Sequence, residues 1–208
     1  MSQALRDAWS TLLAQPIRFV AQECLEAALL GAVPRDRVSE LIRQRRFEAR
    51  LAELLASYYG LQPLSEVGEV ADDDLPVLLL PPSAFAELAM ACGACRHAHT
   101  LAREIRGPQV QQLRERLGDA TYDLAVDWRD AGTGAPAPVG GAALLAAIET
   151  DGQRCVEAWL AVQPITLQAW LRLRFGLAAP LANGSDDDVR LVRQVALALG
   201  VHVERGAA

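Results

Sequence analysis

Two cysteines and two histidines lie within a few residues of one another and carry the donor atoms of a metal site. The run reads Cys92-x-x-Cys95-x-His97-x-His99. Thiolate sulfur and imidazole nitrogen are ligands of tetrahedral zinc, and a C-x-x-C pair usually lies on a tight turn. Here the surrounding apolar pattern is helical, which would place Cys92, Cys95 and His99 on one face and point His97 elsewhere.

This cluster has two interpretations. Either Cys92, Cys95 and His99 form the site of a helical metal- or redox-responsive protein, or the cysteines are small buried side chains that pack against a neighbouring helix. We favour burial and expect no metal and no cofactor, because three ligands on one face leave the fourth without evident geometry. A Cys95–His99 dyad is sterically possible, but nothing marks an oxyanion hole or an orienting group, so we expect no catalytic residues and no enzyme.

Three aspartates, Asp119, Asp123 and Asp127, are four residues apart and share one helical face. Such carboxylates could bind metal or do acid–base work. We favour a solvated helix edge, with Asp119 near the helix N-terminus, where the dipole stabilises a negative charge.

Arginines form a stripe on the long helix that we expect between residues 34 and 59. Arg43, Arg46 and Arg50 follow a three-and-four spacing on a protein that is otherwise acidic. The hypothesis is that they bind an acidic surface of a protein partner, since complementary charges steer specific encounters. The alternative is that they solvate the helix or pair with the acidic connector that follows it, whose acids are Glu66, Glu69, Asp72, Asp73 and Asp74.

The elements that position these residues are predicted to be helices, because apolar residues recur at helical spacing between Pro and Gly. We expect an all-α fold of eight to nine helices with little or no sheet, in which the helix that begins at Pro34 is capped by Gly60 and another helix runs from about Ser83 to Arg106. A short extended VLLL segment in the connector is the one alternative, and its flanking prolines argue against a full strand. Ser185 and Asp188 should form a capping pair for the last helix.

The positions of Pro and Gly also predict the domain organisation. We expect an N-terminal helical region at 1–60, an acidic, Pro-rich connector at 61–82, and a helical core at 83–208 with a Gly/Pro loop at 131–141. Together they are predicted to form one domain over 1–208.

Composition excludes several classes of protein. The net charge of −6 and pI near 5.1 argue against nucleic-acid binding, which needs a coherent basic face. No apolar run is long enough for a membrane helix, and the N-terminus lacks the apolar stretch of a signal peptide. We therefore expect a cytoplasmic protein with reduced thiols.

Residues 75–177 carry a family resemblance. A Pro-led helix follows LPP, an IRG break precedes a helix ending in LG, and LGDATYDLA begins the next. After the Gly/Pro loop come the segments EAWLAVQP, with Trp159, and QAWLRLRFGL, with Trp170. This order resembles the SctK family (YscK-like proteins), which are adaptors of bacterial type III secretion sorting platforms.

The resemblance implies an all-helical, non-catalytic adaptor that supports effector secretion. Proteins similar to SctK meet the cytoplasmic domain of the inner-membrane ring protein SctD on one side and the pod protein SctQ on the other. The protein would then lie at the cytosolic face of the inner membrane without inserting into it. A helical ligand-binding regulator is the other class considered, but the arginine-rich helix lacks a preceding turn that would present a DNA-reading helix.

Overall fold

The computed structural model describes residues 2–130, 140–175 and 184–206. It is 79% helix and has no strand in these ranges, which confirms the all-α class. The described ranges contain 12 α-helices, more than the eight or nine predicted. Three additions account for the difference: two expected helices each divide into two, and the connector contains a short helix of its own.

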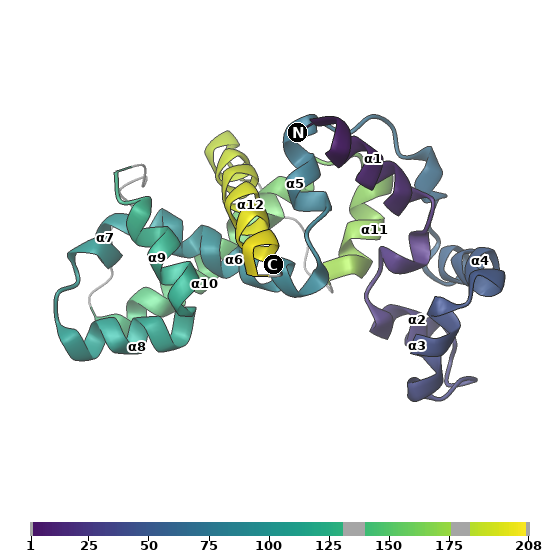
Figure 1. Cartoon of the computed structure of the whole chain (residues 1–208), viewed down its shortest axis with the longest axis horizontal. Coiled ribbons are helices and arrows are strands. Elements are labelled where there is room, and N and C mark those ends of the chain that lie inside the picture. Colours follow the sequence, from purple (N-terminus) through teal and green to yellow (C-terminus); the bar gives the residue numbers. More distant parts are fainter. Residues whose placement is uncertain (1, 131–139, 176–183, 207–208) are drawn as a thin grey trace. The chain divides into compact units, whose positions relative to one another are not determined.

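Contacts divide the chain into two compact units (Figure 1). Unit 1 comprises Met1–Pro82 and Val162–Pro180, and unit 2 comprises Ser83–Ala161 and Leu181–Ala208. The first boundary falls where the expected connector ends. The return of residues 162–180 to unit 1 is a long-range exchange that local sequence signals do not encode.

Unit 1 is built from short helices joined by tight turns and single 3-10 turns. Its α-helices are α1 (Ser2–Leu13), α2 (Gln22–Ala28), α3 (Arg35–Arg43), α4 (Glu48–Tyr59), α5 (Leu75–Leu78) and α11 (Ile165–Phe175). Its 3-10 helices are η1 (Pro16–Arg18), η2 (Arg45–Phe47), η3 (Leu64–Glu66) and η4 (Asp72–Asp74).

Helix α11 holds the first unit together through two large side chains. Trp170 is 1% exposed, and its indole N–H donates to the carbonyl of Gln62 at 2.8 Å. Arg174, also buried, donates to the carbonyls of Phe19 and Leu80 and stacks over the Phe19 ring. Burial lowers the pKa of Arg174 to about 10. One helix from late in the chain therefore ties together backbone groups of the first 82 residues.

The single helix predicted at 34–59 is wrong. Helix α3 ends at Arg43, Gln44 adopts an extended conformation, and α4 begins at Glu48 after the 3-10 turn η2. No Gly or Pro marks this break. The end of the prediction was right: Gly60, with φ +65°, caps α4 and donates its N–H to Ala56.

The first four residues of the LPVLLLPP segment form a helix rather than the extended alternative. Asp72–Asp74 make a 3-10 turn, and Leu75–Leu78 continue it as α5. Pro76 fits there because it lies in the first turn, where its missing N–H has no helical partner to lose.

Unit 2 contains the remaining helices, which are longer. They are α6 (Pro82–Arg96), α7 (Ala98–Arg103), α8 (Gly107–Leu117), α9 (Asp119–Asp127), α10 (Gly141–Ala161) and α12 (Asp186–Gly206). The helix expected at 83–106 breaks at His97, which separates α6 from α7. Most of the Gly/Pro loop predicted at 131–141, residues 131–139, lies outside the described residues.

Helices α6 and α10 cross at backbone contact. A side chain on Gly93 would overlap the carbonyl of Ile148, and one on Gly152 would overlap the carbonyl of Ala89. The two glycines face each other, since each would also meet the other's backbone nitrogen. This crossing brings the second half of α6 against the middle of α10, and both cysteines of the C-x-x-C pair are buried on α6.

Helix α12 begins with the predicted cap. The Ser185 hydroxyl accepts from the Asp188 N–H at 3.2 Å, and the Asp188 carboxylate accepts from the Ser185 N–H at 3.0 Å. This reciprocal pair confirms the capping prediction. None of the helices in the described ranges is long and apolar enough to cross a membrane.

Candidate functional site

The Cys/His cluster separates in the structure. Cys92 and Cys95 are 0% and 1% exposed in the core of unit 2, whereas His99 is exposed and its Nε2 lies 3.4 Å from the Arg103 guanidinium. His97 is buried at the break between α6 and α7. In the parts of the chain described, no three His, Cys, Asp or Glu side chains are placed to hold a metal ion.

Burial governs the chemistry of these thiols. It raises the pKa of Cys95 to about 12 and that of Cys92 well above its ordinary value. Cys155, on α10, is also buried and has a pKa raised to about 12, by burial first and by the neighbouring Asp188 carboxylate second. A thiol with so high a pKa carries almost no thiolate at neutral pH, and the thiolate is the nucleophile and the metal ligand.

Three buried or part-buried polar contacts in unit 2 join segments that are distant in sequence. Arg96 forms an ion pair with Asp188, and the Cys155 thiol donates to the same carboxylate at 3.4 Å. His97 Nε2 lies 2.8 Å from an Asp151 oxygen, which fixes α10 against the α6–α7 break. These contacts span from 33 to 92 residues, so local spacing could not have identified them.

The arginine stripe does not lie on one helical face. Arg43 ends α3, Arg46 lies in η2 and Arg50 lies in α4, so the prediction that their three-and-four spacing puts them on one helical face is wrong. All three side chains are exposed. Arg46 bonds Gln44 and stacks on the Phe47 ring at 4.6 Å. Partner binding by these arginines stays a prediction.

One acid of the connector forms an ion pair outside the arginine stripe. Asp72 pairs with Arg6 of α1 at 2.5 Å, and both side chains are about half exposed. Asp74 is buried.

The aspartates of α9 do not form a paired-carboxylate site. Asp119 and Asp123 both accept from the Arg114 guanidinium of α8, at 2.8 and 2.6 Å. That guanidinium also lies 4.5 Å above the Tyr122 ring. The arrangement clamps α8 to α9, and Asp127 is exposed at the far end of α9.

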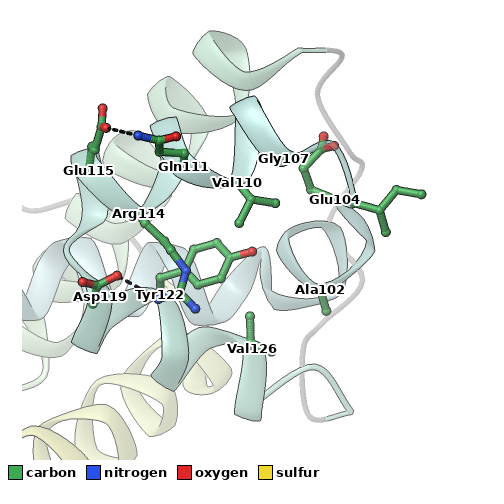
Figure 2. A pocket seen from close by; sticks show the side chains of 11 residues that line it. Ala102, Glu104, Gly107, Val110, Gln111, Arg114, Glu115, Asp119, Tyr122 and Val126 are labelled. Carbon is green, nitrogen blue, oxygen red and sulfur yellow. Dashed lines mark hydrogen bonds and ion pairs between the residues drawn. The ribbon is translucent and has the colours of Figure 1, made fainter.

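Beside this clamp lies a groove of about 820 Å³ bounded by α7, α8 and α9 (Figure 2). We name it the Ile105 groove. Its apolar lining residues are Ala102, Ile105, Val110, Tyr122 and Val126. Ile105, in the turn between α7 and α8, is 89% exposed, so a large apolar side chain stands in solvent at the groove's edge.

Hydrogen bonds hold the polar side chains that line the groove. Glu104 accepts from the Arg106 guanidinium at 2.6 and 2.8 Å, and these hydrogen bonds lower the pKa of Glu104 to about 2. The Gln111 amide donates to Glu115 at 3.0 Å, one turn along α8. Figure 2 shows Glu104, Gln111 and Glu115 around the wall, with Val110 and Val126 facing the space between the helices.

The sequence did not predict this groove. A signal was present: Ile105 is a bulky apolar residue inside the charged break Arg103–Gly107, where solvent exposure is expected. Helical periodicity does not assign a role to a single apolar residue in a break between helices. The three walls of the groove come from helices whose packing no sequence motif predicts.

Comparisons with known proteins leave the family open. No protein-family model, no curated protein and no solved structure matches the chain.

Proposed function

We propose that this protein is a non-catalytic adaptor of a bacterial type III secretion system. It would link the cytoplasmic domain of the ring protein SctD to the pod protein SctQ at the cytosolic face of the inner membrane, and so support effector secretion. The resemblance in residues 75–177 carries this proposal.

The helix boundaries agree with the pattern on which the resemblance rests. Pro82 begins α6, the IRG break separates α7 from α8, and Gly118 separates α8 from α9. Trp159 and Trp170 fall on α10 and α11, on the two sides of the Pro164 break, and both are buried. The segments that carry the resemblance therefore fall on packed helices, which is consistent with an all-helical adaptor.

The division into two units supports an adaptor role in physical terms. Each unit has its own buried core and its own exposed surface. An adaptor that meets two assemblies needs two surfaces, and separate units allow each surface to be shaped by its own packing. In unit 2 the three thiols are buried with raised pKa values, which suits a structural part better than a reactive one.

Co-purification tests the proposal directly. The full chain should co-purify with separately expressed SctD cytoplasmic domain and with SctQ, and should bridge the two when all three are mixed. Deleting the gene should abolish effector secretion and the membrane-associated foci of tagged SctQ. A folded protein that binds neither partner would refute the adaptor role.

The exposed arginines of the α3–α4 corner provide a second test. If they bind an acidic platform surface, Arg43→Glu, Arg46→Glu and Arg50→Glu together should abolish binding to one partner and secretion, since a broken desolvated charge pair costs roughly 2–5 kcal/mol. The triple variant should keep the wild-type circular dichroism spectrum. Normal secretion by the folded variant would make these arginines a solvated surface only.

A further inference from the structure

We propose that the Ile105 groove binds an amphipathic helix of a protein partner, with an apolar ridge and basic flanks. The inference does not rest on the secretion role and would hold in any complex that the protein forms.

The first observation is that a large apolar side chain, that of Ile105, is exposed to solvent. Ile105 is 89% exposed and borders a groove whose floor includes Tyr122, Val110 and Val126. Exposed apolar side chains scattered singly are ordinary, but one that borders an apolar concavity is typical of a docking site. A partner side chain placed beside Ile105 would remove both surfaces from water.

The second observation concerns the polar groups. Glu104 is held by Arg106, Gln111 by Glu115, and Arg114 by Asp119 and Asp123. A site for a small polar ligand presents polar groups that converge on the ligand. Here they are engaged along the wall, so the groove offers mainly apolar surface and shape. A row of apolar side chains fits that lining.

The charge of the groove's wall determines which charged residues the bound helix should carry beside its apolar ridge. Arg114 is shared by two carboxylates, and Glu115 bonds only a neutral amide among the contacts described. Helices α8 and α9 together carry four carboxylates (Glu115, Asp119, Asp123 and Asp127) and two guanidinium groups (Arg114 and Arg116), so this side of the groove is negative, as is the whole chain. Lys or Arg beside the apolar ridge would be attracted, whereas an acidic helix, a nucleic acid or an anionic lipid surface would be repelled.

The dimensions suit a helix. Helix α8 has 11 residues and forms one wall, so the wall is about 16 Å long, or three turns. A partner helix of that length presents apolar residues at i, i+4 and i+7 to one side, which is the way amphipathic helices occupy grooves.

The test uses two designed peptides of about 14 residues, each with leucines at helical spacing. One has lysines on its remaining positions and the other has glutamates. Binding to the full-length protein is measured by fluorescence anisotropy at physiological ionic strength, and hydrogen exchange locates the site. The Leu/Lys peptide should bind, should slow exchange in residues 102–126, and should bind more tightly than the Leu/Glu peptide.

Matched variants make the test specific. Ile105→Glu should weaken the Leu/Lys peptide by about tenfold or more, as for a groove anchor. Ile165→Glu is the control, because Ile165 is 80% exposed and lies on α11 outside the groove. Glu115→Lys should also weaken binding, whereas Glu69→Lys, an exposed acid in unit 1, should leave it unchanged.

Three results would overturn the proposal. The first is equal binding of the Leu/Lys peptide to wild type and Ile105→Glu. The second is equal binding of the two peptides. The third is a concentration-dependent dimer, seen by sedimentation, that Ile105→Glu abolishes, because a second copy of this chain would then be the occupant. Failure to bind SctD or SctQ would refute the proposed function and leave this result untouched.

Discussion

Burial sets the behaviour of the thiols of Cys92, Cys95 and Cys155. Of these, Cys95 and Cys155 have pKa values of about 12, and that of Cys92 is raised well above its ordinary value. We predict that a disulfide reagent such as dithionitrobenzoate modifies only Cys24, which is half-buried, in the folded protein at pH 8. In denaturant all four cysteines should react. Rapid modification of Cys92 or Cys95 in the native protein would contradict their burial.

The carboxylate of Asp188 is buried and interacts with Ser185, Cys155 and Arg96. Burial raises its pKa, but hydrogen bonds from Ser185 and Cys155 and the charge of Arg96 outweigh burial and leave the pKa below its usual value. A lowered pKa in the folded state means that ionised Asp188 stabilises the fold above its unfolded pKa, near 4. That stability is lost as pH falls through the lower, folded pKa.

Asp188→Asn should therefore reduce the free energy of unfolding by roughly 3 kcal/mol at pH 7, because it leaves Arg96 without its buried partner. Chemical denaturation at several pH values measures the difference from wild type, which should shrink below about pH 4. Asp186→Asn is the control, since Asp186 is exposed in the same first turn of α12. A difference that does not depend on pH would show that the charge contributes nothing.

At the scale of elements, α6 and α10 cross with their backbones in contact. Gly152→Ala should destabilise the protein by about 1–3 kcal/mol or more, because the added carbon meets the Ala89 carbonyl and the helices must move apart. Gly200→Ala is the matched control. Gly200 lies inside α12 with open space around it, so alanine there should stabilise by roughly 0.5–1 kcal/mol.

Thermal unfolding of the two variants measures both effects, and opposite shifts of the midpoint are expected. If Gly152→Ala were as stable as wild type, the backbone contact between α6 and α10 would not be a feature of the protein in solution.

The elements also show what local sequence can and cannot predict. Gly60 and the Ser185–Asp188 cap lie where the sequence places them, because caps depend on one or two adjacent residues. The break at Gln44 carries no such signal, apart from the charged Arg45 and Glu48 that interrupt the apolar pattern. The metal hypothesis also relied on local helical spacing, which placed His99 on the same face as Cys92 and Cys95. In the structure the two cysteines are buried and His99 is exposed.

The discontinuity of unit 1 is the main feature of the whole molecule. Residues 1–82 lack α11, whose Trp170 and Arg174 satisfy backbone carbonyls of Gln62, Phe19 and Leu80. A fragment of residues 1–82 should therefore have reduced helicity and no cooperative thermal transition. A synthetic peptide of residues 162–180, added in excess, should restore both by circular dichroism.

The same peptide with Trp170→Ala and Arg174→Ala is the control and should not restore the transition. Cooperative unfolding of the fragment alone, at the midpoint of the full chain, would mean that unit 1 does not need its late segment.

The interleaved order of the two units also bears on how the chain is synthesised. At about 5–20 residues per second, roughly 5–20 s separate the emergence of Pro82 from that of α11 on the ribosome. During that interval the nascent first segment carries Phe19 without Arg174 of α11, which stacks on the Phe19 ring in the native state. Newly made chains should therefore depend on a ribosome-associated chaperone, and a slower rate of translation between codons 83 and 165 should lower the yield of native protein.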